Sequence, residues 1–145
     1  MNKSLFSTFL LLISLTVNAQ TKIIAHRGFS SMAPENTLAA FQKAIDIGAP
    51  YFELDVHKTK DDSLIVIPDY NLSSTSSNNA KRTVSDMNYA ELENVRVGYS
   101  KKFVNEFKNE KIPTLREAFQ LAKGEIKVCI EIKVTGIEAA VLKAI

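Results

Sequence analysis

The stretch Ala25-His26-Arg27-Gly28 decides the fold, together with two triplets further along the chain, Glu53-Leu54-Asp55 and Glu131-Ile132-Lys133. Each lies at or near the end of a short apolar run that is typical of a strand. Side chains two residues apart on a strand point to the same face. The two acids of the first triplet therefore share a face, as do the acid and the lysine of the second. Three carboxylates, a histidine, an arginine and a lysine at strand ends predict a site for a metal ion and a phosphate group.

Residues 1–19 predict an export signal that precedes the folded domain. Lys3 gives a basic start, residues 5–17 form a largely apolar run, and Val17-Asn18-Ala19 is a small-residue cleavage pattern. The alternative is a membrane anchor, which needs about 20 apolar residues, more than this run offers. We therefore expect a signal peptide over residues 1–19, a domain over residues 20–145, a periplasmic or secreted product, and no stable membrane anchor after cleavage.

The composition is that of a globular protein, with 46% hydrophobic and 23% charged residues and a formal net charge of +2. This near balance of charge gives no reason to expect a nucleic acid partner. Cys129 is the one cysteine in the sequence, so it has no partner for an internal disulfide. We expect it to be a small buried residue of a strand.

Apolar periodicity predicts strands that alternate with helices. The predicted strands cover residues 23–26, 51–57, 64–67 and 126–133. The predicted helices begin near Asn36 or Thr37, near Ser85 or Asp86, at the capping box of Thr114, and after Gly136. The segment 64–67 is continuously apolar, as buried parallel strands are. The pattern therefore predicts an α/β fold with a parallel sheet.

Functional side chains at the carboxyl ends of successive strands are typical of (β/α)8 barrels, although doubly wound sheets also bind ligands at that edge. The glycines form neither a dinucleotide-binding nor a P-loop signature. A barrel typically needs about 250 residues, and the chain without its leader has about half as many. We expect the N-terminal portion of a (β/α)8 barrel, truncated after about four strands, as a fragment or an incomplete gene product.

Several ordered motifs resemble the N-terminal half of the glycerophosphodiester phosphodiesterases, over residues 23–133. The matching stretches are His26-Arg27-Gly28, Pro34-Glu35-Asn36-Thr37, Ala40-Phe41, Gly48-Ala49, Glu53-Leu54-Asp55-Val56, Thr59-Lys60-Asp61, Ile112-Pro113-Thr114-Leu115 and Glu131-Ile132-Lys133. The resemblance implies a TIM barrel of the phospholipase-C-like phosphodiesterase type. It also implies hydrolysis of a small glycerophosphodiester to glycerol 3-phosphate and an alcohol, with a divalent cation.

The resemblance implies a role for each matching residue. The metal ligands would be Glu53, Asp55 and Glu131, an oxygen-only set that suits Ca²⁺ or Mg²⁺ better than zinc. The phosphate would be bound by Arg27, whose guanidinium can form two parallel hydrogen bonds to it. The catalytic residues would be Lys133, beside the phosphate, and His26, the first of two histidines that share proton transfer.

The second histidine of this pattern is missing, because Pro68-Asp69 stands where the family has His-Asp. The following stretch, residues 74–78, also lacks the family's arginine. Loss of one general acid or base lowers the rate by roughly 10²–10⁴. The alternatives are therefore an impaired protein that still binds metal and phosphodiester, a non-functional fragment, or a single-base reading error at position 68. We expect His57 to be a solvated loop residue. We expect Glu35 to lie in the first turn of a helix, where the helix dipole favours an acidic side chain and explains its presence in part.

Overall fold

The computed structural model describes residues 21–73, 82–98, 100–103 and 105–145. The predicted signal peptide and the serine-rich stretch 74–78 lie outside these ranges. The elements are β1 (Ile24–Ala25), α1 (Leu38–Asp46), β2 (Tyr51–Lys58), β3 (Leu64–Val66), a 3₁₀ turn (Val84–Asp86), α2 (Tyr89–Leu92), α3 (Ser100–Phe103), α4 (Leu115–Ala122), β4 (Lys127–Ile132) and α5 (Glu138–Ala144). Among the described residues, no helix is both long enough and apolar enough to cross a membrane.

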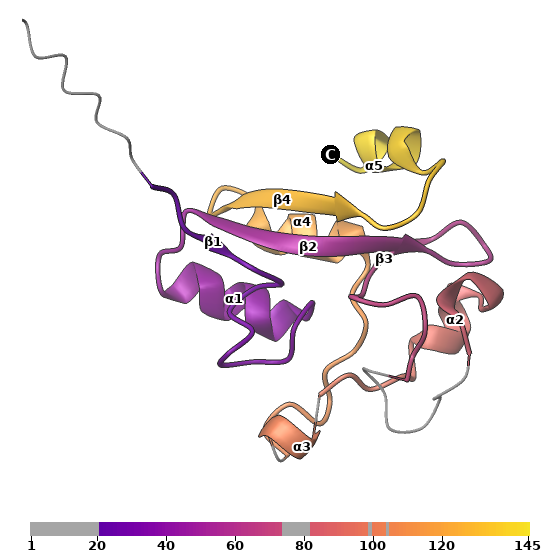
Figure 1. Ribbon diagram of the computed structural model, residues 1–145, viewed down its shortest axis with the longest axis horizontal. Helices are drawn as coiled ribbons and strands as arrows, with labels where there is room; N and C mark the ends of the chain where they lie inside the picture. The colour runs from indigo at the N-terminus through magenta and orange to yellow at the C-terminus, as the bar shows by residue number, and fades with distance from the viewer. Residues whose placement is uncertain (1–20, 74–81, 99, 104) are drawn as a thin grey trace, which may run out of the picture.

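The long strand β2 organises the sheet (Figure 1). One of its edges pairs in parallel with β4, in a register that sets Asp55 beside Glu131. β1 pairs in parallel with the beginning of β2, where Ile24 is opposite Tyr51. The α/β architecture with parallel strands is thus confirmed.

The prediction that residues 64–67 form a parallel strand is wrong. β3 runs antiparallel to β2 as the second arm of a hairpin, with Ile65 opposite His57. The connection between the two strands, residues 59–63, is too short for a parallel crossover, which needs about a dozen residues or more. The continuous apolar run has a different cause, because Ile65 and Ile67 are buried in a separate hydrophobic cluster beneath the 3₁₀ turn and α2.

The main hydrophobic core lies between β2 and the helices α1 and α4. Phe52, Leu54 and Val56 alternate along β2 and are fully buried. The ring of Phe52 stacks on Phe41 of α1, with 4.3 Å between the centroids. The helices cover this face of β2. The side chains that alternate with these apolar residues therefore lie on the opposite face of the strand.

Two of the three helix starts predicted from capping residues are confirmed. Thr37 accepts a hydrogen bond from the Ala40 amide and begins α1. Thr114 forms the predicted capping box with Glu117 at the start of α4. The short helix predicted to begin at Ser85 or Asp86 is instead a 3₁₀ turn followed by α2, whose capping box starts at Asn88.

The expectation that Cys129 is fully buried is wrong, because its side chain is only partly covered. The reason lies in β4, which pairs with β2 along one edge and with no second strand within the described ranges. The exposed fraction of Ile132, near the end of β4, is 38%.

We predict that Gly28→Ala destabilises the fold more than Gly48→Ala. Both glycines have positive φ, +79° and +70°, so each substitution carries a left-handed penalty of about 1–2 kcal/mol. A Cβ at Gly28 would also lie 2.7 Å from the main-chain carbonyl carbon of Ala40, whereas a Cβ at Gly48 meets nothing within 4 Å. Overpacking costs typically about 1–3 kcal/mol, which is the expected extra loss in the free energy of unfolding by chemical denaturation. Equal losses would contradict the close packing of the β1–α1 loop on α1.

Candidate active site

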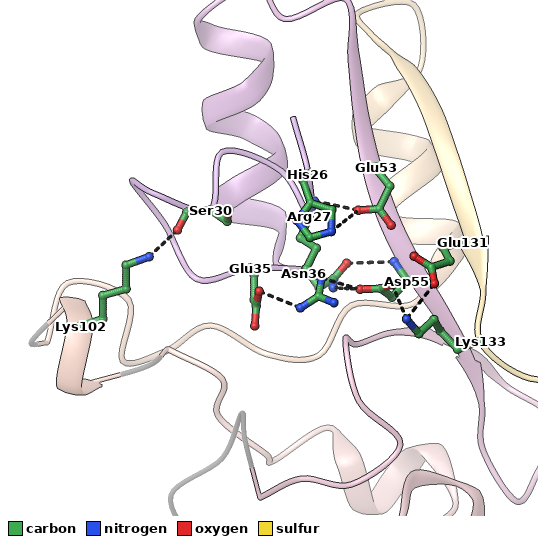
Figure 2. A network of polar contacts seen from close by, with 10 residues as sticks. All are labelled: His26, Arg27, Ser30, Glu35, Asn36, Glu53, Asp55, Lys102, Glu131 and Lys133. Atoms are coloured by element: carbon green, nitrogen blue, oxygen red, sulfur yellow. Dashed lines mark hydrogen bonds and ion pairs between the residues drawn. The ribbon is translucent and has the colours of Figure 1, made fainter. Parts of the chain in front are cut away.

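Three carboxylates meet where the parallel strands end (Figure 2). Glu53 and Asp55 project from β2, and Glu131 lies beside Asp55 on β4. One oxygen from each can be chosen so that all three lie within 4.8 Å of one another. The alternation of side chains along β2 and the parallel register of β4 together produce this cluster.

The burial of the cluster is unequal. Side-chain exposure is 0% for Asp55, 13% for Glu53 and 54% for Glu131. Glu53 Oε1 and Asp55 Oδ1 are buried and have no hydrogen-bond partner among the described residues. Burial disfavours the charged form and raises the pKa of Glu53. Because a buried carboxylate oxygen without an aligned hydrogen bond is costly, the donor set and these two oxygens fit a hard divalent cation.

Lys133 supplies a positive charge next to the cluster. Its Nζ lies 2.9 Å from Glu131 Oε1 and 3.3 Å from Asp55 Oδ1. The hydrogen bond to Glu131 raises the pKa of Lys133 and lowers that of Glu131. The main chain of Lys133 also donates to the carbonyl oxygen of Val56 on β2, which keeps the residue at the site.

Acidic side chains contact both the main chain and the side chain of Arg27. Its φ of +56° turns the amide towards Glu53 Oε2, to which it donates at 2.9 Å. Nη1 donates to Glu35 Oε2 at 3.1 Å, and Nε lies 2.9 Å from Asp55 Oδ2. The Nε contact is an ion pair without an aligned hydrogen bond. Glu35 precedes α1 and binds this guanidinium, so its predicted place in the first helical turn is wrong.

His26 lies at the rim of the site. Its side chain is 68% exposed, and Nε2 is 3.9 Å from Glu53 Oε2. The structure therefore brings together all six residues that the sequence singled out, namely His26, Arg27, Glu53, Asp55, Glu131 and Lys133. The imidazole of His26 is accessible from the solvent side of the site.

Sequence reasoning missed Asn36, which is 2% exposed and lies against Asp55. Its Nδ2 donates to Asp55 Oδ2 at 2.8 Å, and its Oδ1 accepts from the Asp55 amide at 3.1 Å. The residue also has a φ of +56°. Asn is one of the few non-glycine residues that tolerate this conformation, so an Asn in a loop beside a predicted helix start was the available signal.

His57 is not the solvated loop residue that the sequence predicted. It belongs to β2, is 4% exposed, and follows Glu53 and Asp55 on their face of the strand. Burial lowers its pKa, against the opposing effect of the nearby Pro68 main chain. Neither ring nitrogen has an aligned hydrogen-bond partner among the described residues. Pro68 itself is buried directly after β3.

Known proteins resemble this chain in sequence and in fold. The model of the glycerophosphoryl diester phosphodiesterase family matches residues 26–143. A glycerophosphodiester phosphodiesterase of Caldanaerobacter subterraneus is 42% identical over 132 residues, which are 87% of this chain and 53% of that protein.

Solved structures agree. The crystal structure of a glycerophosphodiester phosphodiesterase from Agrobacterium tumefaciens has a TM-score of 0.76 at 35% identity, covering 86% of this chain and 53% of that one. A phosphodiesterase of Oleispira antarctica, in complex with the product sn-glycerol-3-phosphate, has a TM-score of 0.75 at 33% identity, covering 86% and 49%.

The chain spans about half the length of the curated relatives that it matches. Over that span it has the α/β fold of these phosphodiesterase structures. Together, the matched residues and the shared fold show that this chain belongs to the glycerophosphoryl diester phosphodiesterase family.

Proposed function

We propose that the protein is an exported, metal-dependent phosphodiesterase that hydrolyses glycerophosphodiesters to glycerol 3-phosphate and an alcohol. The observation that carries the proposal is the carboxylate cluster, in which two buried oxygens lack an aligned hydrogen bond, set between Arg27 and Lys133. Positive groups beside an anionic metal site are what a phosphodiester substrate requires. The Oleispira antarctica relative, which holds sn-glycerol-3-phosphate, supports the same class of product.

Glu53, Asp55 and Glu131 would hold the cation, which we propose to be Ca²⁺ or Mg²⁺ because all ligands are oxygens. When bound, the cation would orient a hydroxyl and offset charge on the phosphate. Glu131 is the most exposed of the three and is hydrogen-bonded to Lys133. Cation binding would therefore compete with this lysine, whose ammonium would then be free to face the phosphate.

The chain's own residues would act on the substrate as follows. Arg27, fixed by Glu35 and Asp55, would bind a phosphate oxygen with its remaining donors. A glycerol hydroxyl attacks phosphorus and loses its proton to a base while the leaving alcohol receives one from an acid. Water then opens the cyclic phosphate. His26, exposed at the rim, would carry one of these two protons.

A second candidate is a catalytically impaired protein that binds metal and phosphodiester, which Pro68 favours. A proline ring has no group that transfers a proton at this position. The carboxylates, Arg27 and Lys133 are unaffected by the substitution, so binding would survive the loss of chemistry.

Export is a separate proposal, based on residues 1–19. N-terminal sequencing of the protein recovered outside the cytoplasm should begin at Gln20. A mature protein that retains Met1 would contradict cleavage after Ala19.

We predict that chelation of divalent metal abolishes hydrolysis of glycerophosphocholine by the full-length protein, and that Ca²⁺ or Mg²⁺ restores it. Glu53→Gln keeps the shape of the side chain but removes its charge, so activity should fall by roughly 10²–10³, the typical effect of losing one electrostatic stabiliser. Glu125→Gln is the matched control, because Glu125 is exposed and precedes β4 at its other end. Release of glycerol 3-phosphate measures the rate. Full activity with chelator present would contradict a metal site.

We predict that Pro68→His raises the rate of glycerophosphocholine hydrolysis by roughly 10²–10⁴, the usual contribution of one general acid or base. Pro50→His is the control, since Pro50 is exposed and precedes β2 at the opposite end of the strand. Comparable activity of the unmodified protein and the Pro68→His variant would show that another residue transfers the second proton, and His57→Gln would then test His57. If neither the unmodified protein nor the Pro68→His variant is active but both bind metal, the second candidate function, a catalytically impaired binding protein, is favoured.

A further inference from the structure

Asn36 contacts Asp55 at two points, and its orientation is fixed by both. The Nδ2 group donates to Asp55 Oδ2 at 2.8 Å, while Oδ1 accepts from the Asp55 main-chain amide at 3.1 Å. A flipped amide would set its NH₂ against that main-chain donor and its oxygen against the carboxylate, so only one orientation satisfies both bonds. Asn36 and Asp55 are buried, 2% and 0% exposed, so water does not compete for these groups.

The two oxygens of Asp55 are consequently in different surroundings. Oδ2 accepts from Asn36 and lies 2.9 Å from Arg27 Nε. Oδ1 has no hydrogen bond among the described residues and has only the ion pair with Lys133, at 3.3 Å. Oδ1, with the fewer donors, is the better ligand for a cation, because coordination there breaks no buried hydrogen bond and displaces only the Lys133 ion pair.

Asn36 also joins the β1–α1 loop to the carboxylates of β2. Its own main-chain amide donates to the carbonyl oxygen of Arg27 at 3.0 Å. The Arg27 amide in turn donates to Glu53 Oε2. The loop therefore holds Glu53 through Arg27 and Asp55 through Asn36, so the Asn36 side chain is the connection that orients the second carboxylate.

We propose that Asn36 is a positioning residue that restricts Asp55 to one metal-binding oxygen, Oδ1, and thereby favours the smaller cation. This inference rests on the proposed metal-dependent function. Mg²⁺ demands near-ideal octahedral geometry, whereas Ca²⁺ accepts carboxylates through one or both oxygens. A carboxylate that is held at Oδ2 suits Mg²⁺, and a carboxylate without Asn36 keeps only the Arg27 ion pair at Oδ2, so it can more readily offer both oxygens to Ca²⁺.

The test is the affinity of the full-length protein for Mg²⁺ alone and for Ca²⁺ alone, measured by titration calorimetry after chelation. Asn36→Gly removes the amide but tolerates the left-handed backbone. Loss of a group that orients a ligand typically costs 10–100-fold in metal affinity. We expect a loss of about this size for Mg²⁺ and a clearly smaller loss for Ca²⁺.

Two further variants separate positioning from folding. Asn36→Ala lacks the same amide but strains the backbone at φ +56°, so its melting temperature should be lower than that of Asn36→Gly while its metal affinities match. Asp62→Gly is the matched control, because Asp62 also has positive φ, +61°, and pairs with Lys58 in the exposed β2–β3 turn. Its metal affinities should equal those of the unmodified protein.

The outcomes are distinct. Unchanged Mg²⁺ affinity in Asn36→Gly, or equal losses for both cations, would overturn the role of Asn36 as the residue that selects one oxygen. If the unmodified protein binds neither cation, the proposed metal site itself fails, and this inference fails with it. A larger loss for Mg²⁺ than for Ca²⁺ in both Asn36 variants would support it.

Discussion

The site depends on holding three negative charges within a few ångströms of one another. Like charges at this distance repel, and the low dielectric around the buried Asp55 strengthens the repulsion. Arg27 and Lys133 offset part of it from opposite sides of Asp55, each through an ion pair to a different oxygen. The positive φ of Arg27 accompanies the donation of its amide to Glu53 Oε2, and Lys133, which follows β4, brings its ammonium to Asp55 and Glu131.

Much of this arrangement follows from local rules. Strand alternation places Glu53 with Asp55 on one face, and the apolar residues that alternate with them along β2 require a covered opposite face, which α1 and α4 provide. Parallel pairing then brings Glu131 beside Asp55, because the carboxyl ends of parallel strands meet at one edge. The grouping of the predicted site residues could be obtained from the sequence for these reasons.

Other features depend on information that periodicity does not contain. An apolar run such as residues 64–67 shows that a strand is buried but not which way it runs, and here the short connection before it determines the direction. The depth of His57 depends on the hairpin that covers it. The contact between Asn36 and Asp55 spans nineteen positions and requires the loop conformation at positive φ, which the residue types permit without specifying.

The hairpin has a consequence for how such sequences diverge. β1 and β3 occupy successive parts of the same edge of β2, and residue 68 follows the antiparallel strand β3 with its main chain near His57. Proline lacks an amide hydrogen and is well tolerated at such a strand end. Because the three carboxylates lie on β2 and β4, a change at residue 68 alters the end of the hairpin and not the strands that carry the cluster.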